Sequence, residues 1–424
     1  MSAPRRVLLV DDEPELLHAF ARHLALDDGI DWTLELATSG EEAVRRLDAD
    51  PVDVVVTDLV MPGVDGRTVL EHCIRRHPGV ARILFTGRVD FVEAGSLLAL
   101  AHQFLTKPCD APTLVAVVER AAGLRELLED AALRSLACGV TSLPPSFRSF
   151  AALTQALDDP RTGHGELAAI IDGDPALAAR ILHIANTALF SGGRHPVSEV
   201  RGAVGRLGVQ VVRALALDLA ASTPEDGRPR GARSFSPDAL RDHALRVAAL
   251  ARHLSPPGAI REAAGTAGLL HDVGTLLLAT RTADAYERMA AATGGRTAGS
   301  APFPGTGRNE GATSPDGADR LAAERRFFGA THAALGGYLL GLWGMPSPVV
   351  GAIAGHHDPR TAPEGPAREL AAIVCLADAV ASAQEERPPA TAELAPALEL
   401  VGATVDDLTA WRAWLDERAL EPAA

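Results

Sequence analysis

Carboxylate side chains follow two short apolar segments near the amino terminus. Asp11 and Asp12 come directly after residues 7–10, and Asp58 closes the run 53–58, which contains three consecutive valines. Short apolar runs that end in polar residues are typical of buried parallel strands. Since the carboxyl ends of parallel strands share one edge of a sheet, the three carboxylates are expected to meet there. Carboxylates this close repel one another unless a cation lies among them, and an all-oxygen site favours Mg²⁺.

Lys107 is the only lysine in this chain of 424 residues, so arginine supplies the rest of its 40 lysine and arginine side chains. It lies just after the predicted strand 103–105 and before Pro108, while Thr86 closes the predicted strand 82–85. A compact ammonium group on a flexible stem reaches a phosphoryl oxygen where a planar guanidinium does not fit. A surface lysine left by compositional chance is the alternative, but the strand-end position favours phosphoryl chemistry.

These strand-end residues resemble those of the receiver domains of two-component response regulators, over about residues 5–122. The resemblance implies a doubly wound α/β fold of the flavodoxin-like (βα)5 type, in which a histidine kinase phosphorylates Asp58. It also implies that Asp12, Asp58 and the backbone carbonyl of Val60 bind Mg²⁺ directly, while Asp11 acts through a water molecule.

The same resemblance implies a switch that reads the phosphoryl group. Thr86 would hydrogen-bond that group, and Lys107 would pair with it and form a cis peptide with the following proline. Phe104 occupies the position of the switch aromatic, and a core aromatic on a strand is the alternative. Phosphorylation adds negative charge that biases a two-state element. Helices over 88–100 and 111–128 are implied to flank the signalling face.

Histidines and aspartates form a second set of chemical candidates, on apolar helices further along the chain. His271 and Asp272 are adjacent and interrupt a nearly uncharged predicted helix over 266–278. A buried acid without a partner is costly, so Asp272 needs a cation or a hydrogen-bonded partner. For each histidine taken alone, a satisfied core residue is the alternative. The other members of the set are His243, His332, His356, His357 and Asp378.

The motifs around this set resemble the HD superfamily of metal-dependent phosphohydrolases, and more closely its HDOD output-domain branch, over about residues 136–385. The resemblance implies an all-helical fold in two lobes. The matching stretches are Ser142–Pro145, Asp174–Ala178, Ile184–Asn186, Gly268–Gly274 and Trp343–Pro346.

Resemblance to the catalytic HD enzymes makes the whole histidine–aspartate set a candidate ligand set. Imidazole and carboxylate ligands suit iron, manganese or zinc, and such a metal lowers the pKa of a water for phosphodiester attack. Three departures weigh against hydrolysis. Relatives that hydrolyse cyclic di-GMP carry a lysine where this chain has Thr275, and a glutamate where it has Ala239. Their Gly-Tyr-Pro loop is absent from this sequence.

Two classes of output function follow from these observations. In the first, the HDOD domain is a non-catalytic module that binds an unidentified downstream protein, and its histidine–aspartate set holds a structural metal or is a packed relic. HDOD domains are mostly regarded as signalling modules, which favours this class. In the second, the domain is a metal-dependent phosphodiesterase, for example a cyclic dinucleotide hydrolase. A transcription-factor output is disfavoured because no basic recognition helix is present.

These assignments divide the chain into four parts. We expect a receiver over 1–122, a helical linker over 123–140, an HDOD domain over 141–390 and a helical tail over 391–424. Residues 291–319 are rich in Gly, Ala, Thr, Ser and Pro and predict a flexible insertion rather than a lid.

Two amphipathic stretches raise the question of partner surfaces. The apolar spacing over 121–136 predicts a connecting helix, and a stripe in a homodimer is the alternative. Trp411 and Trp414 are three residues apart and are expected to pack on the domain, with a partner surface as the alternative.

Composition excludes several other classes. A net charge of -15 argues against sequence-independent nucleic-acid binding, which needs a basic surface. The four cysteines form no CxxC motif, which fits a reducing cytoplasm, and we expect no signal peptide. Residues 327–355 carry no formal charge and are long enough to span a membrane. Their prolines and glycines instead predict two helices that meet at Met345–Pro346, and we expect no membrane span.

Overall fold

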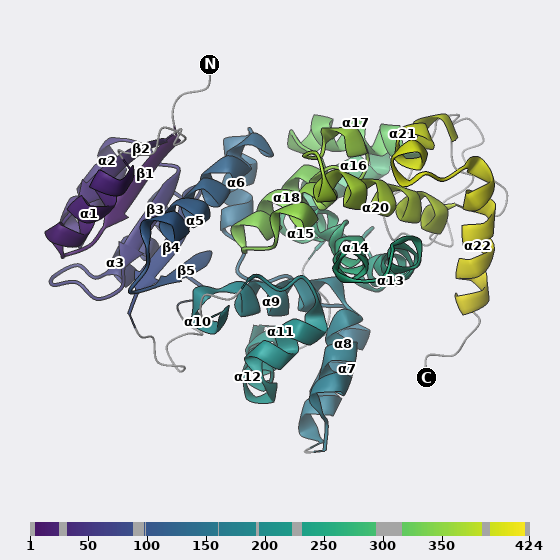
Figure 1. Cartoon of the computed structure of the whole chain (residues 1–424), viewed down its shortest axis with the longest axis horizontal. Helices are drawn as coiled ribbons and strands as arrows, with labels where there is room; N and C mark the ends of the chain where they lie inside the picture. Colours follow the sequence, from purple (N-terminus) through teal and green to yellow (C-terminus); the bar gives the residue numbers. More distant parts are fainter. Residues whose placement is uncertain are drawn as a thin grey trace. The chain divides into compact units, whose positions relative to one another are not determined.

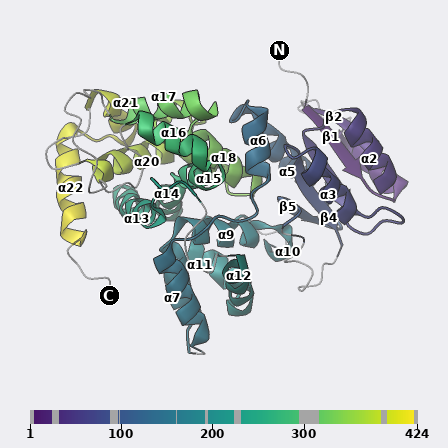
Figure 2. The ribbon, with the colours of Figure 1, turned by 180° about the vertical axis from the view of Figure 1, so that it is seen from behind.

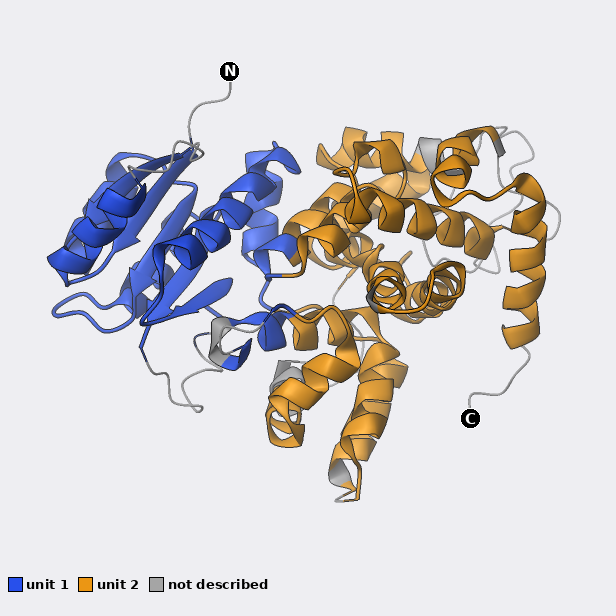
Figure 3. Ribbon diagram, viewed as in Figure 1, with its two compact units in different colours: residues 1–141, 183–196, 341–344 blue, residues 142–182, 197–340, 345–424 orange. Residues whose placement is uncertain are grey.

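The computed structural model describes residues 5–24, 32–87, 97, 99–159, 161–191, 195–222, 231–293, 316–383 and 391–419. It consists of two compact units (Figure 3). Unit 1 comprises residues 1–141, 183–196 and 341–344, and unit 2 comprises 142–182, 197–340 and 345–424. Most of the predicted helix 88–100 and of the predicted insertion 291–319 lies outside the described residues.

Unit 1 is built on a five-stranded sheet in the order β2-β1-β3-β4-β5, in which all neighbours are parallel. This arrangement confirms the doubly wound fold. Strand β2 was missed because its sequence, WTLELA, is only partly buried and lacks the continuous apolar run of a central strand. The strands are β1 (Arg5–Val10), β2 (Trp32–Ala37), β3 (Val54–Asp58), β4 (Ala81–Thr86) and β5 (Gln103–Thr106).

Helices cover both faces of this sheet. Helices α1 (Pro14–Leu24) and α5 (Ala111–Gly123) pack together on one face, and α2 (Gly40–Ala49) and α3 (Gly66–Arg76) on the other (Figures 1 and 2). Side-chain caps start three of these helices, since Ser39, Asp65 and Asp110 each accept a hydrogen bond from a backbone N–H of the first turn.

The predicted continuous helix over 121–136 is wrong. Helix α5 ends at Gly123, a short 3-10 turn, η1 (Leu124–Glu126), follows, and α6 (Ala131–Cys138) starts afresh. The cause is Asp130, whose carboxylate accepts a hydrogen bond from the backbone N–H of Leu133 and so caps a new helix. The sequence predicted one helix because its leucines continue at helical spacing across the break between α5 and α6.

Unit 1 also contains two short segments from further along the chain, which include α10 (Ala188–Ser191). Helix α10 packs against β5. His183 Nε2 lies 3.0 Å from the carbonyl oxygen of His102, which directly precedes β5. The His183 ring stacks on Trp343 with centroids 4.8 Å apart. Buried polar and aromatic contacts therefore tie both segments to the edge of the sheet.

Unit 2 is helical throughout its described residues, which confirms the second half of the predicted fold class. Gly208 has a φ of 78° and separates α11 (Val200–Leu207) from α12 (Val209–Ser222). The elements are α7 (Phe147–Asp158), α8 (His164–Asp172), α9 (Pro175–Asn186, whose last residues belong to unit 1), α11 (Val200–Leu207), α12 (Val209–Ser222), α13 (Pro237–Leu254), α14 (Ala259–Leu270), α15 (Val273–Arg281), α16 (Ala283–Ala292), α17 (Asp316–Phe328), α18 (His332–Leu342, whose last two residues belong to unit 1), α19 (Ser347–Ala354), η2 (Pro359–Thr361), α20 (Pro366–Ser382), α21 (Thr391–Val401) and α22 (Val405–Ala419).

Four of these helices, α13, α14, α19 and α20, pack against one another and form the core of unit 2. The uncharged stretch 327–355 contains the two helices α18 and α19, as predicted. Within the residues that the structure describes, no helix is long and apolar enough to cross a membrane. Trp414 of α22 stacks on His253 of α13 with ring centroids 4.0 Å apart, so this tryptophan packs on the domain as expected.

Gly274 allows a close approach that the candidate site of unit 2 depends on. A Cβ added at Gly274 would overlap the backbone carbonyl oxygen of His332. This position therefore brings the start of α15 against the start of α18, and the two helix starts carry neighbouring members of the histidine–aspartate set.

We predict that Gly274→Ala lowers the free energy of unfolding by about 1–3 kcal/mol, because the new methyl group has no space. Gly205→Ala is the matched control, since a Cβ at this exposed helical glycine meets nothing within 4 Å. The control should be neutral or stabilise by up to about 1 kcal/mol. Urea unfolding followed by circular dichroism measures both, and equal effects would contradict the close-approach argument.

Candidate functional site

The predicted receiver residues meet at the carboxyl edge of the sheet. Asp58 ends β3 and Asp11 follows β1, and the parallel pairing of Val10 with Thr57 places the two aspartates side by side. Carboxylate oxygens of Asp11, Asp12 and Asp58 lie within 4.8 Å of one another. The sequence pattern thus predicted this cluster correctly as a matter of geometry.

Lys107 reaches into this cluster from the end of β5. Its Nζ lies 2.7 Å from Asp11 Oδ2 and 2.7 Å from Asp58 Oδ2. Burial lowers the pKa of the Lys107 ammonium, but hydrogen bonds with the two carboxylates outweigh burial and raise it. Burial also raises the pKa of Asp11, and the hydrogen bond from Lys107 opposes that change only in part. The ammonium is therefore charged and bridges two acids.

Backbone geometry holds the phospho-acceptor candidate in place. The backbone N–H of Leu59 donates to Asp58 Oδ1 at 2.6 Å. A Cβ at Gly66 would overlap the carbonyl oxygen of Asp58, so only glycine fits at the start of α3. The loop between β3 and α3 includes Val60, whose side chain is exposed and whose carbonyl is the predicted third ligand.

The residues of the predicted switch lie at the ends of β4 and β5. Thr86 is buried at the end of β4, and its carbonyl oxygen accepts a hydrogen bond of 2.8 Å from the backbone N–H of Lys107. The Lys107–Pro108 peptide is cis, as expected. Phe104 is buried in β5. Sequence reasoning missed Phe85, whose ring centroid lies 5.2 Å from Lys107 Nζ; its position just before Thr86 was the available signal.

The charges of this cluster suit a divalent cation. Three carboxylates surround one ammonium there. A fourth carboxylate, that of Glu13, has its Oε1 atom 3.8 Å from Lys107 Nζ. The excess of negative charge and the all-oxygen donor set fit Mg²⁺. The donor atoms and charge of this cluster therefore fit the predicted Mg²⁺.

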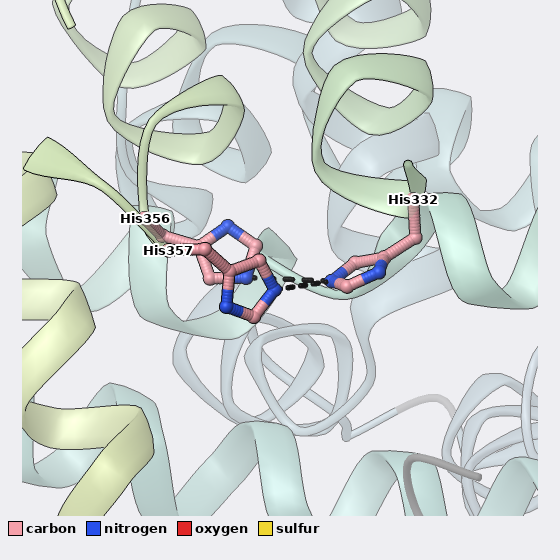
Figure 4. Close-up of side chains that lie close together, drawn as sticks. All are labelled: His332, His356 and His357. Atoms are coloured by element: carbon pink, nitrogen blue, oxygen red, sulfur yellow. Dashed lines mark hydrogen bonds between the residues drawn. The ribbon is translucent and has the colours of Figure 1, made fainter. Parts of the chain in front are cut away.

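The histidine–aspartate set also converges, within unit 2. His332 begins α18, and His356 and His357 follow α19. The Nε2 atom of His332 lies 3.4 Å from Nε2 of His356 and 3.0 Å from Nε2 of His357 (Figure 4). Figure 4 shows the three rings pointing toward one another from two helix ends.

The remaining four residues extend this cluster. His243 Nε2 on α13 lies 3.0 Å from Asp378 Oδ1 on α20. His271, just after α14, has its Nε2 atom 3.9 Å from the same oxygen. Asp272 Oδ1 lies 3.1 Å from His332 Nε2 and so joins the two halves. All seven predicted residues therefore form one continuous group.

The hydrogen bonds of the outer ring nitrogens fix which nitrogen of each imidazole faces inward. Nδ1 of His271 lies 2.7 Å from the carbonyl oxygen of Gly268, and Nδ1 of His356 lies 2.7 Å from that of Ile353. Because a carbonyl oxygen only accepts, Nδ1 carries the proton and Nε2 presents a lone pair. Metal-binding histidines are held in this way. Among the described residues, His271 Nε2 is buried and has no hydrogen-bond partner.

Two charged residues of α17 complete the set, and sequence reasoning missed both. Glu324 is buried, and its carboxylate lies 2.7 Å from His332 Nδ1 and accepts the His332 backbone N–H at 2.8 Å. The guanidinium of Arg320 contacts Glu324 at 3.0 Å and Asp272 at 3.4 Å. It also donates to Thr275 Oγ1 at 2.5 Å. The spacing of Arg320 and Glu324, four residues apart, was the only local signal.

The ionisation of this cluster leaves it with excess negative charge. Burial raises the pKa of Glu324, but the imidazole of His332 and the guanidinium of Arg320 outweigh burial and lower the pKa to about 2. Burial also raises the pKa of Asp272, but the charges of Arg320 and of the nearby imidazoles outweigh burial and hold this pKa well below its usual range. Burial lowers the pKa of His356 to about 3, so this ring is neutral.

Asp378 adds a third ionised acid. Burial raises the pKa of Asp378, but the hydrogen bond from His243 and the charge of nearby imidazoles lower it far more. Opposite these acids stand the guanidinium of Arg320 and the imidazole of His243, whose pKa is lowered by burial but raised more by the hydrogen bond with Asp378. Imidazole nitrogens and carboxylates, with three ionised acids and a buried lone pair on His271 that has no hydrogen-bond partner, fit a transition-metal cation. The donor set is therefore suited to iron, manganese or zinc.

The fold and the two clusters define a receiver-type α/β domain followed by an HD-type helical domain. Family models agree: the response regulator receiver domain matches residues 7–119, and the HDOD domain matches residues 143–300 and 310–359. The chain is therefore a member of the response regulators that carry a receiver domain and an HDOD domain.

Individual relatives match parts of the chain. The C4-dicarboxylate transport transcriptional regulatory protein DctD of Rhizobium meliloti is 34% identical over 139 residues, which are 32% of this chain and 30% of DctD. The transcriptional regulatory protein TrcR of Mycobacterium tuberculosis is 33% identical over 115 residues, 27% of this chain and 44% of TrcR. The chain thus spans less than half the length of these two relatives.

Among the similar solved structures, one covers about two thirds of the chain. The MmoQ response regulator from Methylococcus capsulatus is 28% identical, with a TM-score of 0.48 over 64% of this chain and 98% of that chain.

We predict that Glu324→Gln lowers the free energy of unfolding by about 1.5–3 kcal/mol, because charged hydrogen bonds to His332 are lost in the interior. The substitution also leaves the buried guanidinium of Arg320 with one acid fewer. Glu399→Gln is the matched control, since Glu399 is exposed on α21 and the charge change is the same. Urea unfolding compares the two variants, and equal midpoints would refute the buried-partner argument.

Proposed function

We propose that this protein is a phosphorelay response regulator in which a histidine kinase phosphorylates Asp58. The observation that carries the proposal is the position of Lys107 Nζ, 2.7 Å from a carboxylate oxygen of Asp58 and of Asp11. Asp12, Asp58 and the carbonyl of Val60 would hold Mg²⁺, with Asp11 acting through water. The bound ion would offset charge on the transferring phosphoryl oxygens.

The residues around Asp58 then have distinct roles. Asp58 Oδ attacks the phosphorus atom of the phosphohistidine, and the imidazole of the kinase leaves. The phosphoryl group would carry roughly -1.5 to -2 charges, in place of the single negative charge of an aspartate carboxylate. Lys107 already contacts Asp58 and pairs with the new phosphoryl oxygens, while the hydroxyl of Thr86 donates a hydrogen bond to them. Movement of Thr86 toward the phosphoryl group would make room for Phe104 to turn inward.

Asp58→Asn should abolish phosphoryl labelling of the protein by a small-molecule phosphodonor in the presence of Mg²⁺, because an amide is not a nucleophile for this transfer. Asp50→Asn is the control, since Asp50 is an exposed aspartate of the same unit and should leave labelling unchanged. Radiolabel incorporation or intact-mass measurement gives the result. Labelling that persists in Asp58→Asn would exclude this residue as the acceptor.

For the output domain we propose a signalling module that holds a transition metal and binds a downstream protein. Convergent Nε2 lone pairs, including the buried one of His271, support metal binding. The contacts of Arg320 with Asp272 and Thr275 favour a role without turnover. The guanidinium of Arg320 occupies one oxygen of Asp272. It also contacts Thr275, the position at which hydrolytic relatives carry lysine.

A metal-dependent phosphodiesterase is the second candidate. The observation in its favour is the continuity of the seven-residue group, which offers donors on both sides of Asp272. A bound metal would supply an acidified water for attack on a phosphodiester. In this candidate His271, His356 and His357 act as neutral ligands, and Arg320 orients Asp272 and offers positive charge beside the site.

Metal analysis of the purified protein tests the ligand set that both alternatives share, and an assay for cyclic dinucleotide turnover decides between them. We expect iron, manganese or zinc in the wild-type chain and about one equivalent less in His271→Ala/Asp272→Ala, because two donors are removed. His164→Ala, at an exposed histidine of the same unit, should retain the metal. Turnover of a cyclic dinucleotide by the metal-loaded protein would establish the second candidate. Equal metal content in the double variant and wild type would exclude this ligand set.

A further inference from the structure

A second group of metal-binding side chains lies in unit 1. His72 Nε2 and His77 Nε2 each lie 2.8 Å from the same carboxylate oxygen, Oδ1 of Asp48. The donor atoms of the three residues lie within 4.8 Å of one another. We refer to Asp48, His72 and His77 as the α2–α3 triad.

The local fold brings these residues together although no sequence motif links them. Asp48 lies near the end of α2 and His72 on α3, and the two helices pack side by side (Figure 2). In a continuous helix, residues five apart point in directions about 140° apart. His77 instead caps α3 with non-helical angles, φ -132° and ψ 56°. The end of the helix therefore returns the second imidazole to the side of the first.

The α2–α3 triad is separate from the candidate phosphorylation site. Helix α3 has 11 residues, so its ends are about 15 Å apart. Its first residue, Gly66, packs against Asp58, whereas His77 follows its last residue. Because the helices of a doubly wound fold run opposite to the strands, the triad lies toward the amino edge of the sheet. It cannot take part in phosphoryl transfer directly.

We propose that the α2–α3 triad binds a transition-metal cation of the Zn²⁺ class. Two imidazole nitrogens and one carboxylate oxygen are ligands that zinc takes, and three protein ligands leave a fourth position for water. Mg²⁺ would not compete, because it prefers oxygen ligands alone. The Asp48 carboxyl is ionised, since hydrogen bonds from His77 and His72 lower its pKa. All three side chains are partly exposed, so a cation reaches them without opening the core.

The bound cation would fasten the end of α2 to the end of α3. Zinc bound to the folded state alone stabilises that state in proportion to its occupancy. The receiver would then respond to two ions at opposite edges of its sheet, one at Asp58 and one at the triad. Without metal, the same atoms form a His–Asp–His hydrogen-bonded cluster, which is the alternative that the experiment must separate.

Titration of the full-length chain with Co²⁺, followed by its visible absorption, tests the proposal. Wild type should bind one equivalent more than His72→Ala, and Asp48→Asn should lose the same equivalent. His18→Ala, at an exposed histidine of α1, is the matched control and should bind as wild type does. Equal binding by wild type and His72→Ala would overturn the proposal and leave the triad as a hydrogen-bonded cluster only.

A second measurement separates this site from the histidine–aspartate set of unit 2. In the His271→Ala/Asp272→Ala background, one equivalent of Co²⁺ should remain and should disappear when His72→Ala is added. Zn²⁺ should raise the thermal unfolding midpoint of that background relative to EDTA, and His72→Ala should cancel the rise. Loss of all metal in the background alone would refute the triad while supporting the site in unit 2.

Discussion

Like charges gathered at one point need a counter-charge, and this constraint governs both halves of the protein. At the edge of the sheet, a single ammonium bridges Asp11 and Asp58 at 2.7 Å each. In the helical unit, a single guanidinium stands between Glu324 and Asp272. In each case the acids outnumber the basic side chain. The remaining charge is what makes both clusters suited to divalent cations.

Close backbone approaches make these charge clusters possible. Gly66 lets α3 start against the carbonyl of Asp58, and Gly274 lets α15 start against that of His332. Each glycine stands directly beside an acid-bearing helix or strand end. The fold therefore brings the ends of its elements, rather than their middles, into contact, and the ends carry the polar residues. The close packing at these glycines is therefore a precondition for the two charge clusters.

The sequence predicted the parts of this arrangement that leave a local pattern. Continuous apolar runs marked four strands and their polar ends, and the interrupted apolar helix marked His271 and Asp272. Strand β2 was missed because it lacks the continuous apolar run of the other four strands. The break before α6 was missed because the cap at Asp130 starts a new helix although the apolar spacing continues. Arg320 was missed because its partners Asp272 and Thr275 lie 48 and 45 residues away in the chain. Glu324 was missed because its contact with His332 depends on how α17 and α18 fold together. The same holds for Asp48, His72 and His77, which only tertiary packing unites.

The solitary lysine gives the protein an unusual chemical handle. Apart from any terminal amine, Lys107 carries the only primary amine in the chain, and it is paired with Asp58. Its raised pKa keeps it protonated, and protonated amines are poor nucleophiles. Because there is no other lysine, amine-acylating reagents would modify one side chain only. The rate of that reaction would depend on the ion pairs of Lys107 with Asp11 and Asp58. The acylation rate of Lys107 would therefore report on the state of Asp58 without any introduced label.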